Sequence, residues 1–278
     1  MRWGTWGSNL SENEITQLIE KALSLGLYTF DSADIYGGYT TETTLGNAFH
    51  NMGLERESYQ LIGKCGIKYK GGEKPYKVKS YDLSKDYILQ AVEESLNKLQ
   101  TNYLDLLLIH RPSPLMDAEE IARAFSILRL EGKVRNFGVS NFSSEQFKSL
   151  LEFVPDLLTN QIEISLSSPE AFFDSRVEQM HSLKLQPTAY SPMGGYFSKT
   201  EEKNPRLLEV FEELKQKYNA SEAQLLLAFL RKHPSGIVPV VGTSKLSNLE
   251  HLAKGLEVEI SMEDWFYLLE AQRGHRVP

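Results

Sequence analysis

The chain has 278 residues, a length that suits either two domains of about 150 residues or one closed α/β barrel of about 250. With 41% hydrophobic and 24% charged residues, its composition is that of a folded globular protein and excludes a disordered chain. Thirty Lys and Arg against 37 Asp and Glu give a net charge of −7, which argues against a nucleic-acid partner. The longest apolar run, 225–230, has six residues, whereas a membrane span needs about 18.

The cysteine content and the start of the chain bear on location. Cys65 is the single cysteine, which excludes an internal disulfide and is typical of a reducing compartment. The first residues, Met1-Arg2-Trp3-Gly4, contain no apolar signal-peptide core. We therefore expect a cytoplasmic protein without membrane contact, and the sequence leaves its oligomeric state open.

Apolar strand-like segments alternate with helical segments along the whole chain. The strand candidates are 27–30, 60–64, 104–109, 135–139, 158–164, 187–190 and 237–241. Capping boxes at Ser11/Glu14, Ser143/Gln146 and Ser221/Gln224, and an N-cap at Ser261, mark helix starts. The first eight residues could supply an eighth strand. The pattern predicts an α/β fold of one domain over residues 1–278, a single (β/α)8 TIM barrel. An open doubly wound sheet is the main structural alternative.

One long irregular segment, 66–82, interrupts this alternation. It carries five lysines against Glu73 and Asp82, a local charge of +3. Such a loop could attract an anionic substrate or cover a pocket, but we favour a solvated, mobile loop without a specific role.

Chemically useful side chains follow several of the expected strands. Asp31 ends the second strand of the barrel, Tyr36 lies five residues further, Lys64 ends the third and His110 the fourth. In a barrel these positions share one rim. A phenol is a poor acid at neutral pH unless a cation stabilises its phenolate. Lys64 could provide that cation, with Asp31 holding it.

These four residues together suggest a proton donor directed at a carbonyl oxygen, with His110 donating to the same oxygen or relaying the proton. A carbonyl that is protonated at oxygen needs a nucleophile at carbon. Because the sequence offers no obvious protein nucleophile, a hydride from a cofactor is the natural candidate.

Six motifs in order carry a family resemblance. They are Phe30-Asp31-Ser32-Ala33-Asp34-Ile35-Tyr36-Gly37, Gly63-Lys64-Cys65-Gly66, the run 105–112 ending in His110-Arg111-Pro112, the run 132–142 ending in Ser140-Asn141-Phe142, Asn160-Gln161-Ile162-Glu163 and Ala189-Tyr190-Ser191-Pro192. With these the chain resembles the aldo-keto reductases, and its ending resembles a bacterial branch of that family. Members usually begin earlier, with a hairpin that closes the barrel floor, so we expect this hairpin to be missing here.

The resemblance implies NAD(P)(H)-dependent reduction of small aldehydes or ketones, with Tyr36 as general acid, Lys64 and Asp31 tuning it, and His110 orienting the carbonyl. It also implies a cofactor site without a Rossmann fingerprint. The implied cofactor residues are Trp3, Ser140, Asn141, Gln161, Tyr190, Ser191, Met193, Gly194, Gly195, Gly242, Thr243, Ser244, Lys245 and Asn248. Asn248 stands where an Arg commonly binds the 2′-phosphate of NADP, and Lys245 could bind that phosphate in place of the Arg, as a point charge. The resemblance makes NADP(H) the expected cofactor, and NAD(H) is possible.

Other functional classes stay open to different degrees. A hydrolase is rejected because Phe142 stands where a nucleophile elbow needs Gly. The six histidines show no metal-ligand spacing, so we expect no metal site. Cys65 is interpreted as a small buried apolar residue rather than a redox sensor. Two rivals remain: a regulatory module such as the channel β-subunits that share this fold, and a Schiff-base aldolase that uses Lys64. The physiological substrate cannot be predicted.

Overall fold

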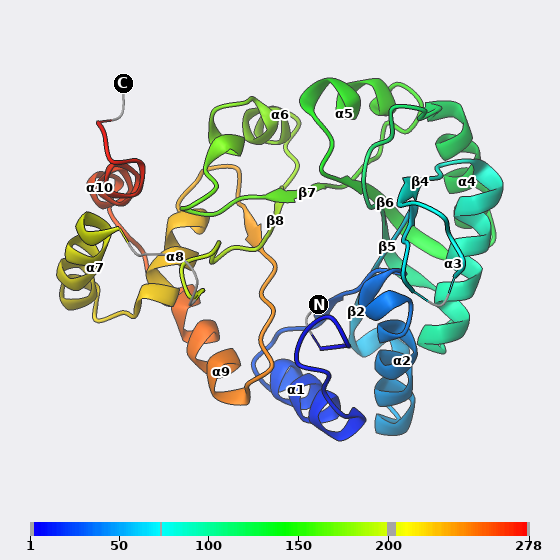
Figure 1. Cartoon of the computed structure of the whole chain (residues 1–278), viewed down its shortest axis with the longest axis horizontal. Helices are drawn as coiled ribbons and strands as arrows, with labels where there is room; N and C mark the ends of the chain where they lie inside the picture. The colour runs from blue at the N-terminus through cyan, green and yellow to red at the C-terminus, as the bar shows by residue number, and fades with distance from the viewer. Residues whose placement is uncertain (1–2, 73, 199–203, 277–278) are drawn as a thin grey trace. The chain divides into compact units, whose positions relative to one another are not determined.

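The computed structural model describes residues 3–72, 74–198 and 204–276. The chain divides into two compact units (Figure 1). The first contains Met1–Asn160 and Gly242–Leu246, and the second contains Gln161–Val241 and Ser247–Pro278.

The first unit alternates short parallel strands with helices. Its elements are α1 (Glu12–Ser24), β1 (Thr29–Asp31), η1 (Tyr36–Gly38), α2 (Thr41–Met52), η2 (Arg56–Ser58), β2 (Gln60–Cys65), β3 (Ile67–Lys68), β4 (Ser80–Tyr81), α3 (Lys85–Leu99), β5 (Leu104–Ile109), α4 (Ala118–Leu130), β6 (Val134–Ser140) and α5 (Ser144–Leu151). The strands β1, β2, β5 and β6 pair in parallel in that order. Their carboxyl ends therefore lie along one edge.

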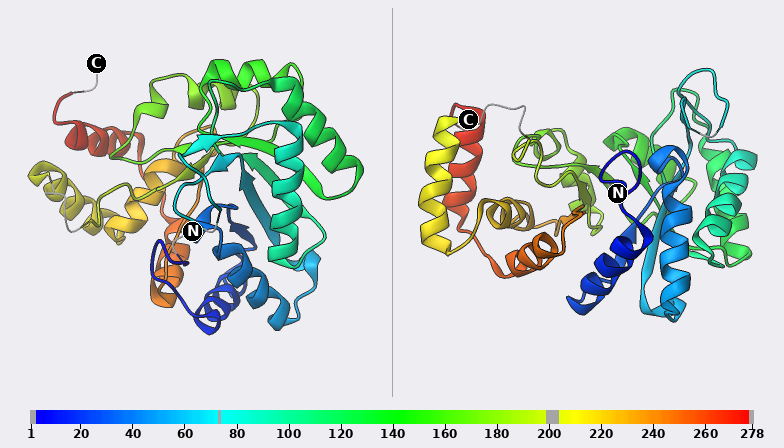
Figure 2. Two further views of the ribbon diagram at one scale, coloured as in Figure 1. Left: turned by 45° about the vertical axis from the view of Figure 1, so that its right-hand side comes forward. Right: turned by 60° about the horizontal axis from the view of Figure 1, so that its bottom comes forward.

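The second unit has the same alternation. Its elements are β7 (Asn160–Glu163, which starts at the last residue of the first unit), η3 (Glu170–Phe172), α6 (Arg176–Ser182), β8 (Thr188–Tyr190), α7 (Pro205–Tyr218), α8 (Glu222–Arg231), β9 (Val238–Pro239), α9 (Leu246–Lys254, of which Leu246 belongs to the first unit), η4 (Gly255–Glu257) and α10 (Met262–Arg273). The strands β7, β8 and β9 are parallel neighbours. Helices α7 and α10 lie side by side (Figures 1 and 2).

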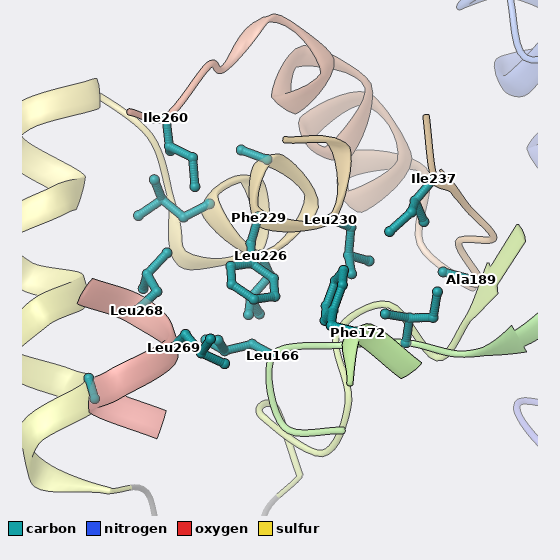
Figure 3. Close-up of a cluster of buried hydrophobic side chains, with 14 of the residues drawn as sticks. Leu166, Phe172, Ala189, Leu226, Phe229, Leu230, Ile237, Ile260, Leu268 and Leu269 are labelled. Carbon is teal, nitrogen blue, oxygen red and sulfur yellow. The ribbon is translucent and has the colours of Figure 1, made fainter. Parts of the chain in front are cut away.

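Apolar faces of these helices supply the core of the second unit. Helix α8 runs through it, and Leu226, Phe229 and Leu230 are almost completely buried (Figure 3). The Phe229 ring stacks on Trp265 with 4.8 Å between centroids. The apolar run 225–230 is therefore part of the core, and its helix is covered on nearly all sides.

The structure confirms most of the predicted elements. All seven strand candidates contain or overlap a strand. Ser11, Ser143 and Ser221 form the three predicted capping boxes, and Ser261 caps the last helix.

Two expectations were wrong. Residues 3–8 form bends and turns instead of a first strand, because their backbone groups bond within the segment rather than to a neighbouring strand. The segment 66–82 is not simply a bare solvated loop. It contains the antiparallel pair β3–β4, and Lys68 and Lys74 form ion pairs with Asp82 and Glu94, each at 2.5 Å.

Candidate active site

Lys64 is the centre of the group of residues predicted to be catalytic. It lies on β2, and its side chain is 1% exposed. Its ammonium group donates to Asp31 Oδ2 at 2.6 Å, to the Ser32 carbonyl at 2.7 Å and to the Tyr36 phenol oxygen at 3.3 Å. An ammonium has three N–H donors. All three are therefore used inside the protein, and this fixes the position of the charge.

Strand register explains why residues far apart in sequence meet here. Asp31 is the last residue of β1 and pairs with Ile62. Lys64 lies two residues further along β2 and pairs with Leu108 of β5. His110 follows the end of β5, and its backbone N–H donates to the Cys65 carbonyl at 2.9 Å. The parallel pairing thus brings Asp31, Lys64 and His110 to one edge of the sheet.

Electrostatics keep Lys64 charged. Burial by itself lowers the pKa of this lysine, but the Asp31 carboxylate and the Tyr36 phenol outweigh it and hold the pKa above the ordinary 10.5. Lys64 is therefore an ammonium ion at every pH at which the protein is expected to work.

Tyr36 opens the short helix η1 and is half-buried. Its ring packs against a small cluster that includes the buried Ile35, Tyr39 and Ile67. It also meets the His110 ring edge to face, with 5.9 Å between centroids and an angle of 81°. The phenol thus lies between a fixed cation and an imidazole.

His110 is 8% exposed. Burial lowers its pKa well below 6.5, and the charges of Lys64 and Arg111 act in the same direction. Within the described residues, its buried Nδ1 has no hydrogen-bond partner. The imidazole is therefore neutral at neutral pH.

Two buried carboxyl groups near the site, those of Asp34 and Glu42, were not singled out from the sequence. Asp34 is 7% and Glu42 1% exposed. Burial raises the pKa of Glu42 to about 7. Burial and the nearby Glu42 raise the pKa of Asp34 well above its usual value. In the sequence, these two residues are marked only by their nearness to Tyr36. A Glu in the first turn of a helix is normally solvated, so the pattern does not predict that Glu42 is buried.

The first unit also contains several of the predicted cofactor residues. Ser140 is buried at the end of β6, and its hydroxyl accepts from the Asn141 amide at 2.8 Å. The segment 242–245 precedes α9, where Lys245 N–H donates to Thr243 Oγ1 at 3.1 Å. Trp3 is not on a strand. Its indole N–H donates to the Thr243 carbonyl at 2.7 Å.

The remaining predicted cofactor residues belong to the second unit. Gln161 is buried on β7, and Tyr190 ends β8. Ser191, Met193, Gly194 and Gly195 form the turn that follows. Gly194 has φ +53°, and a Cβ there would lie 1.8 Å from Ser167 Oγ, so only glycine fits. Asn248 is exposed on α9.

The described residues contain no group of side chains that could hold a metal ion and no helix that could span a membrane. No three His, Cys, Asp or Glu side chains of residues 3–72, 74–198 and 204–276 are grouped as metal ligands. None of the helices in those ranges is long and apolar enough to cross a membrane.

Comparisons with known proteins agree on one family. The model of the "Aldo/keto reductase family" matches residues 1–273. The uncharacterized oxidoreductase YcsN of Bacillus subtilis is 39% identical over 97% of this chain and 92% of its own length. A 6-dehydroglucose reductase of Agrobacterium fabrum is 35% identical over 99% of this chain and 94% of its own. The crystal structure of an aldo/keto reductase from Klebsiella pneumoniae in complex with NADP and acetate matches with a TM-score of 0.78 at 24% identity, covering 100% of this chain and 90% of that one.

Proposed function

The chain belongs to the aldo/keto reductase family, and on that premise we propose that it reduces a small aldehyde or ketone with Tyr36 as the proton donor. Family membership makes it an NAD(P)(H)-dependent oxidoreductase. The observation that carries the proposal is the position of the Lys64 ammonium, 3.3 Å from the Tyr36 oxygen and 2.6 Å from Asp31.

The direction of the hydrogen bond assigns the proton. Lys64 donates to the Tyr36 oxygen, so the hydroxyl hydrogen of Tyr36 stays available for a substrate oxygen. When that hydrogen leaves, the phenolate is stabilised by a cation already in place, which requires no reorganisation. Asp31 holds this cation.

His110 has a complementary role. A buried N–H without an acceptor is less well tolerated than a buried lone pair. Because Nδ1 is buried without a partner among the described residues, the hydrogen of the neutral ring belongs on Nε2. We propose that Nε2–H donates to the substrate carbonyl oxygen and orients it toward Tyr36.

The residues of the 242–245 segment suit an anionic cofactor. Gly242 is exposed, and a Cβ there would meet no atom within 4 Å, so the backbone can approach a ligand closely. Lys245 is an exposed cation beside the start of α9, where free helix amides also favour anions. We propose that this segment holds the phosphates of NADP(H), and that Ser140, Asn141, Gln161 and Tyr190 hold the nicotinamide. The bound cofactor supplies the hydride.

The finer architecture is part of the proposal. We propose that residues 1–278 form one domain, a single (β/α)8 barrel, which is supported by the family and by the TM-score of 0.78 to the Klebsiella pneumoniae aldo/keto reductase. Urea unfolding followed by fluorescence and by circular dichroism is expected to give one coincident transition. Two separated transitions would contradict it.

For the substrate, the name of one relative suggests a first group of compounds. The Agrobacterium fabrum protein is named a 6-dehydroglucose reductase. We propose that sugar-derived aldehydes are among the substrates of this chain, and that the screen should begin with them beside simple aliphatic and aromatic aldehydes.

Replacement of Tyr36 by Phe tests the assignment. We expect steady oxidation of NADPH with an aldehyde by the wild type, and a loss of about 10²–10⁴-fold in kcat for Tyr36→Phe with unchanged NADPH binding in a fluorescence titration. Tyr28→Phe is the matched control, because Tyr28 is 53% exposed. A Tyr36→Phe variant with near-normal turnover would refute the assignment.

The same measurements separate the two rivals. Bound cofactor with negligible turnover across the panel favours a regulatory module. Trapping of a carbonyl compound on Lys64 by borohydride favours a Schiff-base aldolase. The aldolase is disfavoured because Lys64 uses all three N–H donors within the protein and its pKa is raised, so it has no free amine lone pair for attack.

A further inference from the structure

The first described residues fold into a small closed loop, residues 3–10. The Leu10 N–H donates to the Trp3 carbonyl at 2.8 Å, and the N–H groups of Gly7 and Asn9 donate to the Gly4 carbonyl at 3.0 and 3.1 Å. This loop is the dark-blue start of the chain in Figure 2. We call it the N-terminal loop. Its shape is set by its own backbone hydrogen bonds, so the loop can move as a single unit.

One side of the N-terminal loop is bonded to the segment proposed to hold the cofactor phosphates. Trp3 is 8% exposed, and its indole N–H donates to the Thr243 carbonyl at 2.7 Å, across 240 positions of sequence. Thr243 in turn accepts from the Lys245 N–H. A displacement of the 242–245 segment therefore acts directly on Trp3.

The other side of the loop is bonded to the turn that carries Tyr36. The Thr5 hydroxyl donates to the Gly37 carbonyl at 3.0 Å, and the Thr40 hydroxyl donates to the same carbonyl at 2.8 Å. Gly37, Gly38 and Tyr39 have φ of +61°, +68° and +81°, a run of left-handed backbone that costs energy at Tyr39. The carbonyl held by Thr5 belongs to the residue directly after Tyr36.

Close packing leaves little freedom between the loop and this turn. A Cβ on Gly4 would lie 2.2 Å from Thr41 Oγ1 and 3.7 Å from the Gly37 Cα. A side chain at position 4 would collide with the Thr41 hydroxyl, so the loop lies directly against the start of α2 and close to the Gly37 backbone. The hydrogen bonds of Trp3 and Thr5 are thus connected through a short, well-packed piece of chain.

We propose that Trp3 and Thr5 are positioning residues that couple cofactor binding at the 242–245 segment to the placement of Tyr36. The inference rests on the proposed function for the identity of the ligand at that segment. Such coupling is reciprocal in binding free energy. A cofactor that fixes the N-terminal loop also stabilises the turn that carries Tyr36, and a turn already in that position raises the affinity for the cofactor.

The test uses variants that remove one hydrogen bond and keep the shape. Trp3→Phe removes the indole N–H, and Thr5→Val removes the hydroxyl. Thr5→Ser retains a hydroxyl and serves as the rescue. The matched controls are Trp265→Phe, which removes an indole N–H that donates to the Phe229 carbonyl at 2.9 Å in the second unit, and Thr29→Val, which removes a hydroxyl that donates to the exposed Gln60 side chain at 2.8 Å. Circular dichroism verifies the fold of each variant.

The main readout is hydrogen exchange of the amides of residues 33–41 with and without NADPH. We expect NADPH to slow this exchange in the wild type and in both controls, and to have little effect on it in Trp3→Phe and Thr5→Val. Because a neutral hydrogen bond changes an equilibrium by about fivefold, we expect Trp3→Phe to raise the Kd of NADPH about fivefold. Thr5→Val is expected to lower kcat by a similar factor and to weaken NADPH binding less, and Thr5→Ser to recover most of kcat.

The outcomes distinguish the two proposals. If the wild type binds NADPH and turns over aldehydes but Trp3→Phe and Thr5→Val behave like the controls in exchange and kcat, the coupling is refuted and the proposed function stands. If the wild type binds no NADPH and reduces no aldehyde of the panel, both are refuted.

Discussion

Replacement of Asp31 by Asn tests how much the site depends on a charge beside Lys64. The two ions are 2.6 Å apart, and their side chains are 13% and 1% exposed. With an effective dielectric of about 20, this separation corresponds to an attraction of about 6 kcal/mol. Desolvation of both ions offsets part of it, and loss of one partner of a buried pair typically costs about 3–5 kcal/mol. We expect a loss of this size in the free energy of unfolding of Asp31→Asn.

The assay is urea unfolding at neutral pH, with Asp156→Asn as the matched control. Asp156 also pairs with an arginine at 2.5 Å, but the side chains of Arg129 and Asp156 are 43% and 57% exposed, so we expect a loss below about 1 kcal/mol. Equal small losses in both variants would refute the view that burial makes the Asp31–Lys64 pair strong.

The pH dependence gives a second check on the same pair. The pKa of Lys64 in the folded protein is raised above 10.5. The contribution of the pair is therefore complete below about pH 10.5 and is lost as the pH rises through the raised value. On the alkaline side, the difference between wild type and Asp31→Asn should begin to shrink only as the pH rises through that raised value. In turnover assays, the less stabilised ammonium is expected to lower kcat of the variant by about 10–100-fold, which is part of the roughly 10²–10⁴-fold that a positioned proton donor contributes.

Other substitutions have expected outcomes of their own. Because burial lowers the pKa of His110 well below 6.5, unfolding at lower pH takes up a proton, so stability falls as the pH drops below about 6.5. His110→Asn should reduce this acid dependence in urea unfolding at pH about 7 and about 5, and an unchanged dependence would contradict it. Gly46→Ala would place a Cβ 2.2 Å from the Lys98 carbonyl. It should lower the melting temperature far more than Ala48→Gly in the same helix, because the control creates a cavity but no clash. Equal melting temperatures of the two variants would count against the close packing of α2 and α3. Ser221→Ala removes a side chain that accepts from Gln224 N–H and should cost about 1 kcal/mol in thermal unfolding, so a neutral effect would show that this cap adds nothing.

The sequence predicts which side chains gather in the candidate catalytic group, because their positions follow from the order of the strands. Asp31, Lys64 and His110 each stand at or near the carboxyl end of an apolar segment, and parallel pairing of β1, β2 and β5 brings these ends to one edge. The helix starts were predictable for a similar reason, since a capping box is a local contact between residues three positions apart.

The contacts that were missed are not local and have no residue pattern. The third acceptor of the Lys64 ammonium is the backbone carbonyl of Ser32, and any residue type has such a carbonyl. The N-terminal loop was expected to be a strand, because the sequence does not show that the Gly4 carbonyl accepts two hydrogen bonds from within the loop. The burial of Glu42 depends on how closely α2 packs, which in turn depends on Gly46 meeting the backbone at Lys98.

Lys64 and His110 are both buried, but the pKa of the lysine is raised and that of the histidine is lowered, because their charged neighbours differ. Both side chains lose water, which disfavours their charged forms. Lys64 has a carboxylate at 2.6 Å that reverses this effect, whereas His110 faces the positive charges of Lys64 and Arg111, which add to it. At neutral pH the site therefore contains one fixed cation and one neutral imidazole. This difference suits the proposed roles, in which the lysine stabilises a phenolate while the histidine donates a hydrogen bond without competing as an acid.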